Sequence, residues 1–324
     1  MNIELRPLRL GEILDRTFQL YRARFALFLG IAAASTLLEL LWSALQLGET
    51  SLLGRGHIVG PALQVITTAT AVVGWAFGFG CAALATAAIN RAVHSIYEGK
   101  SVGIASAYVA VRSRWLTCVW ANILAFFIAW SPVIVVVFSV LMSVALAKTA
   151  KSLTQANAVT FVYGFAAIAA VVAVPLCLWL SLRYSLAIPA CVQEGIGTLR
   201  SLKRSVTLSR ESRGRIFVLL LVVGAAWMVI LMALMIPTFA ILAKNKGHMA
   251  PGLTVYTLAV SFLCSTLMKP IYGIGLTLFY YDARVRKEGY DVEWMLEHST
   301  LPETVVSPDP FTGSEPTSPE IILE

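Results

Sequence analysis

The sequence predicts an all-α fold: a polytopic bundle of about six transmembrane helices. Only 13% of the 324 residues are charged, 58% are hydrophobic, and the mean hydropathy is +0.76. Soluble domains carry roughly 25% charged residues, so this composition favours lipid as the solvent. The apolar residues also form long blocks between charge-rich stretches. A bilayer core about 30 Å thick needs roughly 20 such residues per helix, which these blocks supply.

Six blocks are long enough, and we place the spans near 25–47, 61–89, 116–147, 158–182, 216–243 and 253–281. Four of them contain an internal proline: Pro132, Pro175, Pro237 and Pro270. Proline argues against a helix in water. In a membrane, neighbouring helices and local backbone adjustment satisfy the freed carbonyl, and the proline is tolerated as a kink.

The basic residues predict the orientation of these spans. Nineteen of the 25 Lys and Arg residues fall in the N-terminal segment, the second and fourth connections and the C-terminal segment, against five in the alternate connections. This asymmetry predicts an even number of spans with both termini in the cytoplasm. The first block follows 24 residues with three acidic side chains and precedes no small-residue cleavage site, so we expect no signal-peptide removal. We expect a multi-pass protein of the inner (plasma) membrane.

The chain also shows a repeat of about 95 residues. Glu-Gly occurs at 98–99, 194–195 and 288–289, and the first two pairs precede an amphipathic stretch, Arg-rich sequence and a span. This predicts three helical hairpins, each entered through a cytoplasmic amphipathic helix. The apolar faces expected for these three helices are Leu10, Ile13, Leu14, Phe18, Tyr21 and Phe25; Ile104, Tyr108, Val111 and Trp115; and Leu199, Leu202 and Val206.

Basic side chains flank these faces and are candidates for binding lipid headgroups. They are Arg16, Arg22, Arg112, Arg114, Arg200, Lys203 and Arg204. Three interpretations remain open: simple anchoring, recognition of anionic membrane lipid, or docking of a partner protein at the cytoplasmic face. Nucleic-acid binding is not expected, because the basic residues follow the membrane topology instead of forming a compact patch.

The chain divides into a membrane domain over 1–298 and a tail over 299–324. The tail is rich in Pro, Ser and acidic residues and has no Lys or Arg. Such a composition buries too little apolar surface to fold, so we predict disorder after a short helix at 292–297.

Two charged residues inside the spans are the main candidates for a site. Glu39 and Lys269 lie about 22 Å and 20 Å from the cytoplasmic side at 1.5 Å per residue. The two residues are therefore candidates for an ion pair between the first and last spans, which would either fix the helix register or form part of a proton or substrate relay. The alternative is that a kink at Pro270 lets the Lys269 amine reach a backbone carbonyl. In the second span, Gly74, Gly78 and Ala82 recur every four residues, a pattern typical of close helix packing.

Enzyme signatures are missing from the sequence. The four histidines lie in separate regions, and there is no GxSxG, phosphate-binding loop or dinucleotide fingerprint. We therefore expect no catalytic residue, no metal and no cofactor, although an intramembrane enzyme built from dispersed residues stays a third option.

Three segments resemble bacterial membrane proteins of the glycerophosphoryl diester phosphodiesterase membrane-domain family. They are LRPLRLGEILDRTFQLYRARFALFLG, LRYSLAIPACVQEGIGTLRSLKRSVTLSR and LFYYDARVRKEGYDVEWMLE. Some members of that family carry a fused catalytic phosphodiesterase domain, which this sequence lacks. The resemblance therefore implies a membrane module alone, serving envelope lipid or phosphodiester metabolism.

The sequence thus supports two leading functions. The first is a non-catalytic membrane module that engages anionic lipid or a partner protein, and the second is a transporter or channel subunit that uses Glu39 and Lys269. A transporter predicts a polar cavity that reaches Glu39. A lipid-engaging module predicts a dry bundle whose basic helices flank lipid-sized grooves.

Overall fold

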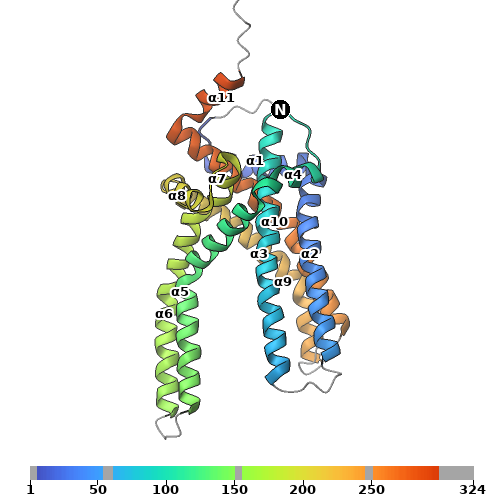
Figure 1. Ribbon diagram of the computed structural model, residues 1–324, viewed down its shortest axis with the longest axis vertical. Helices are drawn as coiled ribbons and strands as arrows, with labels where there is room; N and C mark the ends of the chain where they lie inside the picture. Colours follow the sequence, from blue (N-terminus) through green and yellow to red (C-terminus); the bar gives the residue numbers. More distant parts are fainter. Residues whose placement is uncertain (1–5, 54–60, 150–154, 245–250, 299–324) are drawn as a thin grey trace, which may run out of the picture.

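The computed structural model describes residues 6–53, 61–149, 155–244 and 251–298, and within these ranges it is all-α without a strand. Six helices are long and apolar enough to cross a membrane (Figure 1). They are α2 (Phe25–Leu53), α3 (Pro61–Tyr97), α5 (Trp115–Thr149), α6 (Gln155–Tyr184), α9 (Arg213–Lys244) and α10 (Pro251–Glu288). The predicted fold class is confirmed. The tail predicted to be disordered lies outside the described residues.

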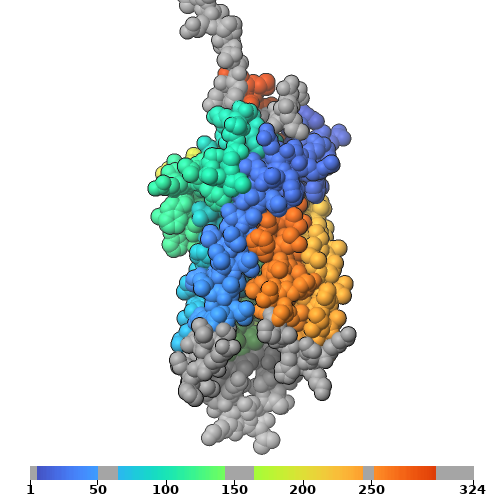
Figure 2. All heavy atoms as spheres, turned by 90° about the vertical axis from the view of Figure 1, so that its right-hand side faces the viewer, coloured from blue at the N-terminus to red at the C-terminus, as the bar shows by residue number. Residues whose placement is uncertain are grey.

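The six long helices pair as the three predicted hairpins, α2–α3, α5–α6 and α9–α10. Helix α10 is the centre of the bundle, because 61% of its most apolar 18-residue stretch is buried. The corresponding share for α5 is 6%. Helices α2, α10 and α9 lie side by side on one face (Figure 2). The α5–α6 hairpin diverges from the other four long helices toward the end of the bundle away from the N-terminus (Figure 1).

The short helices gather at one end of the bundle, which we call the short-helix end (Figure 1). They are α1 (Leu10–Ala23), α4 (Ile104–Val111), α7 (Ala187–Glu194), α8 (Thr198–Ser209) and α11 (Tyr290–His298). Helix α7 was not expected from the sequence, since its residues continue the apolar sequence of the fourth span and no Gly or Pro separates the two. Helix α11 begins two residues before the predicted 292–297 helix.

The three Glu-Gly pairs have one structural meaning. Gly99, Gly195 and Gly289 have φ angles of 72°, 64° and 65°, in the left-handed region that L side chains disfavour. Each follows the end of a helix, α3, α7 or α10, and each precedes a short helix, α4, α8 or α11. The repeat seen in the sequence is therefore a repeated helix end.

Helices α1 and α8 pack into the short-helix end on faces that match the predicted ones only in part. On α1 the predicted Ile13 and Tyr21 are buried together with Thr17 and Leu20, while Phe18 is exposed. On α8, Leu199 is 66% exposed, and the buried side chains are Ser201, Leu202, Ser205, Leu208 and Ser209. The predicted apolar faces are thus wrong in part.

Serine hydroxyls explain the rotation of α8. Ser205 and Ser209 donate hydrogen bonds of 3.0 and 3.2 Å to the carbonyl of Arg183, near the end of α6. The last carbonyls of a helix have no partner within it, so an outside donor stabilises them. Ser205 Oγ also accepts a 3.1 Å hydrogen bond from the backbone N–H of Leu186. The buried face of α8 is therefore selected by hydrogen bonding as well as by hydrophobicity.

Candidate functional site

The two charges inside the spans form an ion pair. Lys269 Nζ on α10 lies 2.7 and 2.9 Å from the two carboxylate oxygens of Glu39 on α2. One turn away, the hydroxyls of Thr36 and Thr266 share a 2.7 Å hydrogen bond between the same helices. The depths estimated from the sequence thus predicted the correct partners, and a hydroxyl pair fixes the register beside them.

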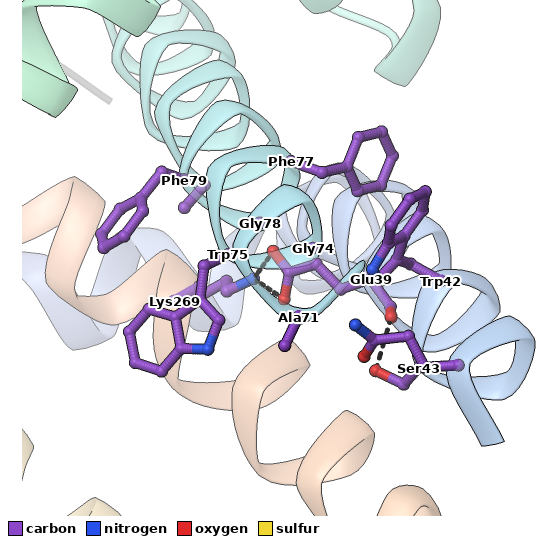
Figure 3. Close-up of a pocket in the computed structure, with 12 residues that line it drawn as sticks. Glu39, Trp42, Ser43, Ala71, Gly74, Trp75, Phe77, Gly78, Phe79 and Lys269 are labelled. Atoms are coloured by element: carbon purple, nitrogen blue, oxygen red, sulfur yellow. Dashed lines mark hydrogen bonds and ion pairs between the residues drawn. The ribbon is translucent and has the colours of Figure 1, made fainter. Parts of the chain in front are cut away.

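The ion pair lies in the wall of an open cavity of about 410 Å³ between α2, α3 and α10, which we call the ion-pair cavity (Figure 3). Its other walls are mainly apolar and include Trp42, Trp75 and Phe79. The side chains of Glu39 and Lys269 keep 30% and 26% of their surface exposed. Side chains therefore do not enclose the pair, and its charges face the largely apolar ion-pair cavity.

The small residues of α3 do not share one role, which corrects the packing interpretation of that stripe. A Cβ added to Gly74 would overlap the indole nitrogen of Trp42 on α2, so this glycine does permit close packing. A Cβ added to Gly78 would meet nothing within 4 Å. Gly78 and the half-buried Ala82 line the ion-pair cavity instead.

This difference gives a matched pair of substitutions on one helix. We expect Gly74→Ala to destabilise the protein by about 1–3 kcal/mol, because Trp42 must move away from the new methyl group. Gly78→Ala should be neutral or stabilising by up to about 1 kcal/mol, because alanine is the better helix former and has room. Thermal melting of both variants in the same detergent tests this, and equal effects would contradict it.

A second cavity of about 250 Å³ adjoins the first, since Phe79 lines both. It lies between α3, α5, α6, α7 and α10, and its polar groups include Asn122 and Tyr184. Asn122 donates a 3.2 Å hydrogen bond to the carbonyl of Phe79. These residues come from separate hairpins, so no local sequence pattern brings them together.

Arg204 and Arg114, both predicted to bind headgroups, have partners within the protein. Arg204 Nε lies 2.6 Å from Glu194, and its Nη2 lies 2.7 Å from Glu288. Burial lowers the pKa of the Arg204 guanidinium, but its bonds to Glu288 and Glu194 outweigh burial and raise the pKa above its ordinary value. Arg114 donates to the carbonyl of Gly195. Both arginines therefore join short helices together, which corrects their assignment as lipid contacts.

The other predicted headgroup contacts differ in exposure. Arg16 is half-buried on α1. Arg22, Arg112, Arg200 and Lys203 are exposed at the short-helix end. No group of three or more His, Cys, Asp or Glu side chains in the described ranges could hold a metal ion.

The fold defines the class of protein: a multi-pass helical membrane protein with a charged pair at mid-span. The chain belongs to the family described as a domain of unknown function (DUF7847), whose model matches residues 8–282. The two limits of the match meet in the structure, since the backbone N–H of Leu8 donates a 2.8 Å hydrogen bond to Asp282. No curated protein and no solved structure matches the chain.

Proposed function

We propose that this protein is a non-catalytic membrane module that binds a lipid-like molecule with a polar head in the ion-pair cavity. The observation that carries the proposal is the Glu39–Lys269 pair, which lines an open and mainly apolar hollow. Apolar walls suit an alkyl chain. The pair offers both signs of charge, so it suits a phosphate, carboxylate or ammonium group.

The cost of intramembrane charge supports a binding role for the pair. Each such charge costs about 2.5–3.5 kcal/mol at a helix centre on insertion scales. A pair that only fixed helix register would be most stable if side chains enclosed it. Here more than a quarter of the side-chain surface of Lys269 stays open to the cavity. A polar ligand group at that position would replace the missing solvation of both charges.

The protein's setting is also part of the proposal. The basic residues support an inner-membrane protein with the short-helix end and both termini in the cytoplasm. There, Arg22, Arg112, Arg200 and Lys203 would meet anionic headgroups or a partner protein. The sequence resemblance to phosphodiesterase membrane domains suggests envelope lipid metabolism as the context, and the DUF7847 family has no assigned function that bears on it.

The second candidate is transport, because a cavity reaches Glu39, although its walls are mainly apolar and a transporter predicts a polar cavity. In that case the bound molecule would cross the bilayer past the ion pair. Proteoliposomes with a fluorescent phospholipid in one leaflet separate the two functions. Transport requires movement of the label between leaflets that Glu39→Gln slows, whereas binding alone leaves the label in place.

The binding proposal is tested by mass spectrometry of lipids retained by the protein in nanodiscs. Gly78→Phe fills the ion-pair cavity from an open position, and Gly224→Phe adds the same group at an exposed position on α9 outside it. We expect Gly78→Phe to reduce the retained lipid about tenfold, because the ring takes the space of the ligand. A tenfold change corresponds to about 1.4 kcal/mol of binding free energy. Gly224→Phe should leave retention unchanged. Equal retention by both variants would refute a binding role for the cavity.

A further inference from the structure

A separate cavity of about 430 Å³ lies at the short-helix end, where three parts of the chain converge. Its wall is formed by the start of α1, the start of α9 and the end of α10. The lining residues are Leu8, Arg9 and Leu10; Glu211, Ser212 and Arg215; and Ala283, Arg286 and Lys287. We call it the basic cavity. None of its four cations was singled out by the sequence patterns, because they lie up to 278 residues apart.

The basic cavity has a surplus of positive charge. Four cations line it, Arg9, Arg215, Arg286 and Lys287. Two carboxylates oppose them: Glu211, whose side chain is 74% exposed, and Asp282, which is fully buried behind the arginines. No ion pair within the described residues involves Arg9. Even with both carboxylates ionised, two positive charges remain uncompensated.

The arginines are held in place by protein groups. Arg215 Nη1 lies 2.7 Å from Asp282, and Arg286 Nε lies 3.0 Å from both oxygens of the same carboxylate. Arg286 Nη2 also donates a 2.6 Å hydrogen bond to the carbonyl of Leu8. A guanidinium fixed in this way keeps further donors for a second acceptor and loses little freedom when it binds one.

The start of a helix adds to the positive electrostatic potential of the basic cavity. Ser212 lies in the cavity wall directly before α9, a helix of 32 residues. The first N–H groups of a helix lack intrahelical partners, and its dipole places partial positive charge at this end. The basic cavity therefore combines fixed guanidiniums, an amine and the positive end of a helix, the three kinds of group that proteins use for phosphate.

We infer that the basic cavity binds a phosphoryl group. The shared chemistry is a phosphate monoester or diester, supplied either by the headgroup of an anionic phospholipid or by a small soluble phosphate. Arg9 and Lys287 contact the ligand from the rim, while Arg215 and Arg286 are positioned by Asp282. This site is distinct from the ion-pair cavity and does not depend on the function proposed for it.

The test uses the full chain and two probes. Inorganic phosphate is titrated against the delipidated protein in detergent, with chloride at equal ionic strength, and the rise in melting temperature gives the affinity. In parallel, nanodiscs with phosphatidic acid in a phosphatidylcholine background report the lipid retained per protein. A response to inorganic phosphate identifies a soluble ligand, and retention of phosphatidic acid alone identifies a headgroup.

Three variants are expected to change phosphate binding in different ways. Arg9→Gln/Lys287→Gln should weaken binding of the responding probe at least tenfold, because it removes two of the four cations that line the cavity. Glu211→Gln removes the carboxylate 3.3 Å from Lys287 and should strengthen it. Arg24→Gln, which removes an exposed cation directly after α1 at the same end, should change nothing.

Two outcomes would overturn the site. One is the absence of any response to either probe by the wild-type chain. The other is a response that Arg24→Gln reduces as much as the double variant, since this would indicate diffuse attraction by the whole basic end. Glu211 lies exposed at the rim, so its variant keeps the test valid if the double variant folds poorly.

Discussion

Lys269→Met is expected to lower the free energy of unfolding by about 3 kcal/mol, because it leaves the Glu39 carboxylate without a partner inside the bundle. The paired Thr36 and Thr266 hydroxyls one turn away join the same two helices, so the substitution removes the charge of Lys269 without removing that contact. The measurement is unfolding in mixed micelles with increasing SDS.

The double variant Glu39→Leu/Lys269→Met should recover most of this loss. It removes both charges together and fills their space with apolar groups of similar size, which is often neutral or stabilising for buried pairs. A coupling energy near zero between the two substitutions would contradict a direct interaction, because residues in contact do not behave additively.

The same variants separate a structural role from a binding role for the pair. If the pair only fixes register, the double variant should keep the wild-type amount of retained lipid once its stability returns. If the cavity binds a polar head, the double variant should be stable and yet lose the lipid. Gly78→Phe gives an independent comparison, because it fills the cavity and leaves both charges in place.

Hydropathy was sufficient to predict the six spans, because lipid imposes a long apolar stretch on each span, and the Glu-Gly repeat predicted their pairing as hairpins. The Glu39–Lys269 contact was also predictable, since charges are so rare inside spans that few partners exist. The buried face of α8 was not. Hydrophobic periodicity does not reveal that Ser205 and Ser209 donate hydrogen bonds to a carbonyl of α6.

The candidate site residues show the same limit of sequence patterns. Gly74 and Gly78 look equivalent in the sequence, yet only Gly74 lies against a side chain of α2. Arg204 has the basic, amphipathic context of a headgroup ligand and is instead bound to two glutamates of the Glu-Gly pairs. Which cation meets a carboxylate depends on contacts between distant segments, and local pattern carries no information about them.

The second large effect is expected at Asp282, where we predict that Asp282→Asn lowers the free energy of unfolding by about 3 kcal/mol. This carboxylate is fully buried, accepts a hydrogen bond from Leu8 and pairs with Arg215 and Arg286. Neutralising it leaves two adjacent guanidiniums without their shared counter-charge. The N-terminal segment should then detach more readily, and trypsin should cleave faster after Arg9. Asp15→Asn, at an exposed position on α1, is the control.

Phosphate should partly reverse this loss, which links the prediction to the basic cavity. A ligand that binds only the folded protein stabilises it by an amount that grows with its concentration over its Kd. With Asp282 neutral, the cavity has one more uncompensated positive charge, so phosphate should bind the variant more tightly than the wild type. Stability falls while affinity rises. If phosphate stabilises Asp282→Asn no more than Asp15→Asn, the two arginines do not contribute to an anion site and their role is to close the bundle.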